Sequence, residues 1–276
     1  MQAQLAQMIA LTCHANAALH GNSMPAFFPG NSTSQFCESI KFFVTGKLSD
    51  GQPQSAVFAD SPETWLHLLP SRSAVGLRLH QHPQNQPGIS DRNASAFVGG
   101  GRQWAIEVMR KGPVSEFWTS RWEVGDRNAP DRKIWRVSYW LMAVEPSADI
   151  SFRSIDAVGA DLRAALTAIR AFALANDCGN FVKSFNDALG ALDDPDADVG
   201  YHNDLAPPGA LQPAAQALLK AAQSAWVFGG MGSWNDMGFQ GETQKEYERV
   251  SDTLFDLLNE AVEAAVDSSL AGAPGA

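Results

Sequence analysis

Two histidines, His80 and His82, have the spacing that best fits a metal site in this sequence. Side chains two positions apart in an extended strand point to the same side of the backbone, so both imidazoles can reach one ion. Asp91, in the polar segment that follows, can add a carboxylate. A structural zinc site normally shows four ligands at recognisable spacing, which this segment lacks. The alternative is a solvated pair of histidines at the end of a strand.

Aromatic residues gather between positions 104 and 140, a stretch that holds five of the eight tryptophans. Trp118 and Trp122 share one face of a predicted strand, and Arg136 lies on the next strand. If helices cover only one face of the sheet, some of these rings are exposed beside arginine. Such rings stack on a sugar or a base, or bind a cation. The alternative is that the rings pack inside the protein, as aromatic strands commonly do.

The segment 226–239 places four glycines between bulky apolar residues. Glycine costs extra backbone entropy on folding, so such a cluster usually serves a particular backbone shape or a close approach. Its amides could cradle an anion, or the loop could dock a partner. It contains no nucleotide-binding or nucleophile-elbow motif. The alternative is a buried turn between helices. The candidate binding residues of this segment are Gly229, Gly230, Gly232, Ser233, Trp234, Asn235 and Asp236.

The acidic segment 193–200 is a weaker candidate for calcium binding. Asp194, Asp196 and Asp198 match the first three ligand positions of an EF-hand loop. The sixth and twelfth positions, which should be Gly and Glu, are Val199 and Leu205. A solvated connector is the alternative. No motif in the chain implies a cofactor.

Hydrophobic periodicity predicts the elements that must position these residues. An amphipathic helix is expected over 2–20, and a short helix begins at Ser61-Pro62. After Pro146 the period changes from two to 3.6 residues. The predicted strands are 36–44, 55–59, 75–80, 103–111, 115–124 and 133–144, with a turn at 49–51. The later helices are 155–175, 179–192, 211–227 and 242–268.

These elements predict an α+β fold, with an antiparallel sheet of five to six strands covered by helices. Residues 1–150 form a β-rich region with an N-terminal helix. Residues 151–276 form a helical region that packs on it as one compact unit. Short connections between the strands of residues 103–144 favour an antiparallel meander.

Composition and charge exclude several classes of function. Of the 276 residues, 45% are hydrophobic, and the net charge is −10. The front half is nearly neutral, whereas residues 151–276 carry 7 Lys/Arg against 18 Asp/Glu. This acidic half disfavours nucleic acid and anionic membranes. No apolar run approaches the ~20 residues of a membrane span, and residues 1–20 lack the basic start of a secretory signal.

Cysteine usage indicates the compartment, and amino-acid composition indicates the type of genome. Cys13, Cys37 and Cys178 are widely spaced and odd in number, which is typical of a reducing compartment. Abundant Ala and an excess of Arg over Lys are compatible with a GC-rich bacterial genome. We therefore expect a cytoplasmic, bacterial protein.

The functional hypothesis is a non-catalytic intracellular binding or protein-interaction protein. Its partner is another protein or a second copy of the chain. The alternative is a metal-assisted hydrolase or small-molecule enzyme that uses His80, His82 and nearby carboxylates. The binding hypothesis is preferred because the sequence shows no nucleophile with a base, no paired carboxylates and no cofactor loop.

Overall fold

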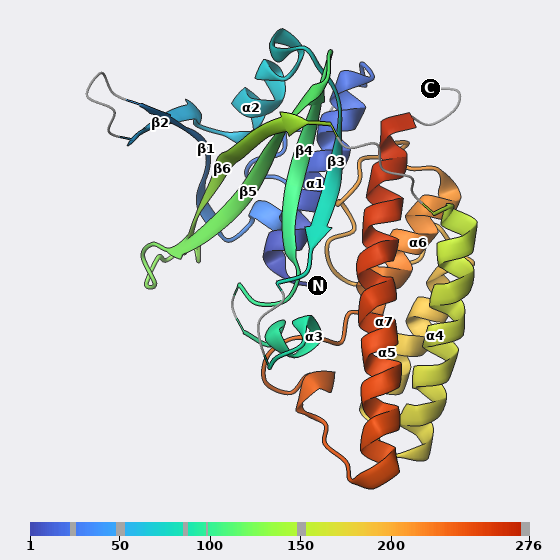
Figure 1. Cartoon of the computed structure of the whole chain (residues 1–276). Helices are drawn as coiled ribbons and strands as arrows, with labels where there is room; N and C mark the ends of the chain where they lie inside the picture. The colour runs from blue at the N-terminus through green and yellow to red at the C-terminus, as the bar shows by residue number, and fades with distance from the viewer. Residues whose placement is uncertain (23–25, 48–52, 85–87, 98, 148–152, 272–276) are drawn as a thin grey trace.

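A six-stranded sheet stands beside a bundle of four long helices in the computed structural model, which describes residues 1–22, 26–47, 53–84, 88–97, 99–147 and 153–271 (Figure 1). The strands are β1 (Cys37–Lys47), β2 (Pro53–Ala59), β3 (Ala74–His82), β4 (Gln103–Arg110), β5 (Val114–Val124) and β6 (Trp135–Pro146). The helices are α1 (Ala3–Leu19), α2 (Pro62–Leu68), α3 (Asp91–Ala94), α4 (Ile155–Ala175), α5 (Gly179–Ala191), α6 (Pro213–Ser224) and α7 (Gly241–Asp267). Short 3-10 helices are η1 (Ser32–Ser34), η2 (Pro70–Arg72), η3 (Trp234–Asp236) and η4 (Ser268–Ala271).

The α+β class and the helical back half are confirmed, and the predicted strands and long helices all exist with shifted ends. Helix α2 begins as expected, because the Ser61 hydroxyl accepts a hydrogen bond from the Thr64 N–H and Pro62 takes the first helical position. The polar stretch 81–101 contains α3, which the sequence did not predict and which Ser90 caps. The turn predicted at 49–51 lies outside the described residues. Within the described chain, no helix combines the length and apolar content needed to cross a membrane.

The prediction of a purely antiparallel sheet was wrong, because the sheet is mixed. Its strand order is β2-β1-β6-β5-β4-β3, and β1 pairs with β6 in parallel, with Phe42 beside Tyr139. The segment that contains α2 carries the chain from β2 to the far edge at β3. The meander β3–β6 then returns to β1. Rings stabilise this junction, since Phe42 stacks on Tyr139 at 5.0 Å and on Trp65 at 4.6 Å.

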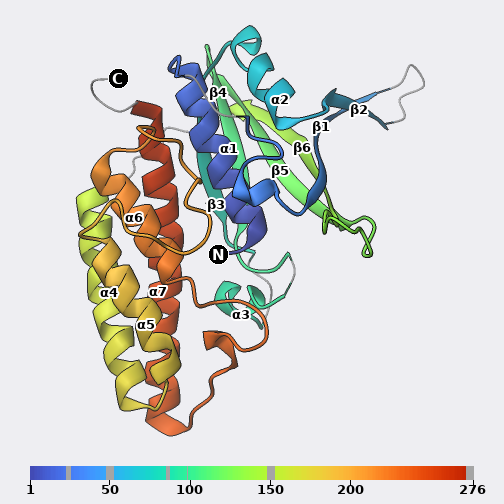
Figure 2. The same cartoon turned by 180° about the vertical axis from the view of Figure 1, so that it is seen from behind.

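Helices α1 and α2 cover one face of the sheet, and the bundle α4–α7 stands at its β3 edge (Figure 2). The N-terminal helix exists, but the prediction that it is amphipathic was wrong, because α1 is buried on nearly all sides and is apolar around most of its circumference. In the parts of the chain that the structure describes, no helix covers the opposite face. Phe43 and Trp140 stack there at 4.7 Å, and both rings are partly exposed.

Side chains from α1 and α7 bond to the outer edge of β3. Asn16 donates from Nδ2 to the Leu77 carbonyl and accepts from the Leu77 N–H, both at 2.7 Å. The Leu79 N–H donates to Asp267 Oδ1 at 2.9 Å. Gly76 has no side chain because a Cβ atom there would lie 2.4 Å from Leu270. Strand β3 is therefore bonded both to the N-terminal helix and to the last long helix of the chain.

We predict that Asp267→Asn stabilises the protein at neutral pH. Burial raises the pKa of Asp267 to about 8, from an ordinary value near 4. The unfolded chain loses the carboxyl proton near pH 4, whereas the folded chain keeps it to about pH 8. The carboxyl therefore destabilises the fold progressively as the pH rises from 4 to 8, by up to about 5 kcal/mol. An amide keeps the acceptor for Leu79 N–H and cannot ionise. Urea unfolding at pH 4.5 and 7.5 should show a gain only at the higher pH, and an equal gain at both would contradict the assignment.

Candidate functional site

The tryptophans of the meander occupy three different environments. Trp118 is fully buried and packs edge-on against Phe42 and Trp65. Trp140 lies half-buried on the uncovered sheet face. Trp122, near the end of β5, and Trp135, at the start of β6, lie at the same tip of the sheet, with their rings edge to face at 5.9 Å. They project from the face that α1 covers.

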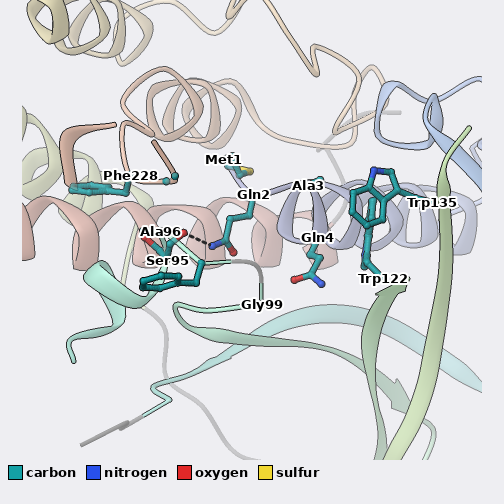
Figure 3. A pocket seen from close by; sticks show the side chains of 13 residues that line it. Met1, Gln2, Ala3, Gln4, Ser95, Ala96, Gly99, Trp122, Trp135 and Phe228 are labelled. Atoms are coloured by element: carbon teal, nitrogen blue, oxygen red, sulfur yellow. Dashed lines mark hydrogen bonds between the residues drawn. The ribbon is translucent and has the colours of Figure 1, made fainter. Parts of the chain in front are cut away.

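Trp122 and Trp135 form one wall of a partly open pocket of about 420 Å³, which we call the central pocket (Figure 3). The first residues of α1 line its floor, where Gln2 donates to the carbonyls of Ser95 and Gly100. Among the described residues that line it, none has an ionisable side chain. The full lining is Met1, Gln2, Ala3, Gln4, Ser95, Ala96, Phe97, Gly99, Trp122, Trp135, Phe228, Gly229 and Gly230.

The glycine-rich segment supplies the opposite wall through Gly229 and Gly230. Phe228 beside them is buried against Phe255 at 5.4 Å. Gly232 has a φ of +82°, a left-handed conformation that favours glycine and lets the chain turn back. The turn closes where the Trp234 N–H donates to the Val227 carbonyl at 3.0 Å. Two predicted binding features, over 100 positions apart in sequence, thus meet at one pocket.

The other half of the glycine-rich segment is anchored inside the protein. Trp234 is fully buried, and its indole N–H donates to Ser251 Oγ at 2.7 Å. The Ser233 hydroxyl donates to the Gly229 carbonyl, and Asp236 accepts from the Gly232 N–H. Asn235 donates to the Arg92 carbonyl at 3.0 Å. These contacts hold the turn in shape, while a binding role for these four residues stays a prediction.

Arg136 does not reach the central pocket. It lies on the uncovered face of the sheet, one residue out of phase with Trp135, and its Nε donates to Glu38 at 2.8 Å. This pair is exposed, so solvent and salt weaken it. The structure therefore separates Arg136 from Trp122, although both come from neighbouring strands.

The two histidines point the same way, as predicted, with nearly parallel rings 6.4 Å apart. His82 is exposed, whereas His80 is buried and its Nε2 bonds to the carboxylate of Glu107 on β4. Arg78 bonds to the same carboxylate. Asp91 instead accepts from the Gln84 N–H. Across the described part of the chain, no three His, Cys, Asp or Glu side chains are grouped to hold a metal.

A second cavity of about 490 Å³ adjoins the central pocket and shares Ala3, Trp122 and Trp135 with it. Its far side is formed by the η1 region and by residues 200–202, among them Ser32 and His202. No motif in the sequence indicates this cavity, because Ser32 and His202 are 170 positions apart. The EF-hand-like carboxylates of the neighbouring segment form local turns, with Asp194 accepting from the Asp196 N–H and Asp198 from the Gly200 N–H.

Trp234→Ala should destabilise the fold by about 3–5 kcal/mol, because it empties a fully buried aromatic site and removes the hydrogen bond to Ser251. Urea unfolding monitored by circular dichroism measures the change. Trp140→Ala is the matched control, since this half-buried ring lies on the uncovered face and should cost less than half as much. Equal effects of the two variants would show that Trp234 is not an anchor.

Glu107→Gln should cost about 3–5 kcal/mol at pH 7, because it removes the buried charge that bonds to Arg78 and His80. Hydrogen bonds from these two residues lower the pKa of Glu107 to about 2, against the opposing effect of burial. The stabilisation is complete above an unfolded pKa near 4.5 and is lost as pH falls towards 2. The difference between parent and variant in urea unfolding should therefore shrink between pH 5 and pH 2.5. A constant difference would refute this assignment.

Two adjoining cavities therefore lie between the two halves of the chain. Comparisons with known proteins give no match, whether to protein-family models, to curated proteins or to solved structures.

Proposed function

We propose that this protein is a non-catalytic binding protein and that its central pocket receives an apolar group of a partner protein. The observation that carries this proposal is the convergence of Trp122, Trp135 and the Gly229–Gly230 turn on one open, uncharged cavity. Its volume of about 420 Å³ falls within the range of roughly 300–1,000 Å³ that is usual for ligand sites.

The lining favours an uncharged, apolar group. The rings of Trp122 and Trp135 offer a large surface for stacking or edge contacts. A charged group would lose its hydration here without an opposite charge to compensate, since the described lining has no ionisable side chain and burial lowers the pKa of the Met1 α-amino group to about 5, which leaves it neutral at pH 7. The indole N–H of Trp122 is buried and has no hydrogen-bond partner among the described residues.

The rim favours a protein over an enclosed small molecule. Phe97 lines the pocket with 66% of its surface exposed, and Met231, next to the Gly229–Gly230 turn, is fully exposed. Exposed apolar side chains around a partly open aromatic pocket are typical of protein-interaction sites. The one hydroxyl in the lining, that of Ser95, donates to the Arg92 carbonyl, so it is not held beside a base.

Selection of a random peptide library against the immobilised full chain tests this proposal. Selected peptides should share an aromatic or branched aliphatic residue. Their affinity should fall at least about tenfold for Trp122→Ala, as at an interface hot spot. For Trp140→Ala, on the uncovered sheet face, it should stay within about twofold, as expected outside the interface centre. Sedimentation of the unliganded chain shows whether a second copy occupies the pocket instead.

A second variant keeps the test informative if Trp122→Ala is poorly folded. Gly230→Leu narrows the same pocket from the opposite wall, and the backbone there is not left-handed and has 3.7 Å of clearance to the Ala96 carbonyl. It should reduce peptide affinity while leaving urea unfolding close to that of the parent. Peptides that share only charged residues, or that bind all variants equally, would place the binding surface elsewhere.

A further inference from the structure

The second cavity differs from the central pocket in the chemistry of its walls. Both cavities share Trp122 and Trp135, so a group that rests on these rings can extend into either. The far side of the second cavity carries Ser32, Thr33, Gln35 and His202, all of which have polar side chains. We call this cavity the polar compartment.

The proton of the Ser32 hydroxyl is already used. Ser32 Oγ bonds to Asp204 Oδ1, and the Ser32 N–H donates to Asp204 Oδ2 at 2.7 Å. A carboxylate only accepts hydrogen bonds, so Ser32 is the donor in the first bond. Asp204 therefore holds the Ser32 hydroxyl, and His202 is not placed to take its proton and activate it as a nucleophile.

This arrangement decides which nitrogen of His202 carries the proton. His202 Nδ1 lies 2.7 Å from Ser32 Oγ, whose single proton points to Asp204. Nδ1 must therefore donate to Ser32, which leaves Nε2 of the neutral ring as an acceptor. Nε2 bonds to none of the described residues. Burial lowers the pKa of His202 below its ordinary value, so the ring is neutral at pH 7.

The backbone at His202 is unusual. Its φ is +51°, in the left-handed region that non-glycine residues rarely adopt, although asparagine, aspartate and histidine are found there more often than others. Such conformations persist where surrounding contacts enforce them, and they recur at functional sites. Here Ser32 Oγ holds the ring nitrogen, Gln223 Nε2 donates to the His202 carbonyl at 3.1 Å, and His202 lines the cavity.

We propose that the polar compartment recognises a hydrogen-bond donor, a hydroxyl or an N–H, carried beside the apolar group, and that His202 Nε2 accepts this bond. This inference rests on the proposed function of the central pocket. An anionic head group is disfavoured, because the Nε2 lone pair and the nearby Asp204 carboxylate both repel it. Protonation of His202 turns Nε2 into a donor, so binding should weaken as the pH falls.

Other titrating groups face the same imidazole. Asp204 lies on the same loop, and the Tyr201 ring is 5.3 Å from His202. The Met1 α-amino group donates to Tyr201 Oη at 3.2 Å, and burial lowers its pKa to about 5. His14 on α1 lies 3.4 Å from the Asp204 carbonyl, and burial lowers its pKa as well. A variant at His202 is therefore needed to assign the pH effect.

The test uses three compounds with one ring and different ends: 3-phenyl-1-propanol, its methyl ether and 3-phenylpropanoate. The full chain is labelled with 5-fluorotryptophan, and the resonances of Trp122 and Trp135 are assigned from their Phe variants. At pH 7.5 the alcohol should bind about fivefold tighter than the ether, as one added hydrogen bond implies. The carboxylate should bind most weakly.

As the pH falls from 7.5 and His202 becomes protonated, the advantage of the alcohol over the ether should decrease. His202→Asn, which tolerates the left-handed backbone, should remove it at every pH, whereas the exposed control His67→Asn should keep it. Equal binding of alcohol and ether, tightest binding of the carboxylate, or an advantage that survives in His202→Asn would overturn the inference.

Failure of the central pocket gives a different result. If no compound shifts the Trp122 and Trp135 resonances, the pocket does not take an apolar group, and both proposals fall. If all three shift these resonances with equal affinity, the central pocket stands and the polar compartment does not contribute. If His202→Asn does not fold, His202→Gly takes its place, because glycine also tolerates a φ of +51° and removes the imidazole; it should likewise remove the preference for the alcohol at every pH.

Discussion

Backbone groups at the outer edge of a sheet must find hydrogen-bond partners, and at β3 side chains of α1 and α7 supply them. Asn16 supplies both a donor and an acceptor to Leu77, and Asp267 supplies an acceptor to Leu79. These bonds fix two helices from opposite ends of the chain against single residues of one strand. They cannot slide without leaving buried backbone groups unpaired, which is costly. The position of the bundle beside the sheet depends on this edge.

The two cavities follow from that position. Helix α1 begins at Ala3, and the tips of β5 and β6 carry Trp122 and Trp135 beside its first turn. Most of this sheet face is filled by α1 and α2, as the burial of Trp118 shows. At its tip the Gly229–Gly230 turn lies opposite the rings, and its lack of side chains leaves space. A pocket between the two halves therefore requires both the edge contacts at β3 and the glycines.

Local signals in the sequence predicted the elements well, because caps and periodicity act within a few residues. The Ser61-Pro62 start of α2 and the change of period after Pro146 are examples. The pairing of β1 with β6 was not predictable this way, since Phe42 and Tyr139 are almost 100 residues apart and alternation fixes a strand's face but not its neighbour. The same limit applies to the site. Trp118 and Trp122 share a face, and tertiary packing makes Trp118 a core residue against Phe42 and Trp65 and leaves Trp122 in a pocket wall. Ser32 and His202 meet through tertiary structure alone.

The outermost strands of the sheet are not equivalent. The edge of β3 is occupied by side chains, whereas β2, at the other end of the strand order, has no described neighbour beyond it. Its residues from Gln54 to Val57 are exposed. A strand from another chain can therefore extend this sheet only at β2, where Pro53 removes one backbone donor and the strand is short. Another strand can thus be added at one edge of the sheet, and the seven residues of β2 determine whether it is.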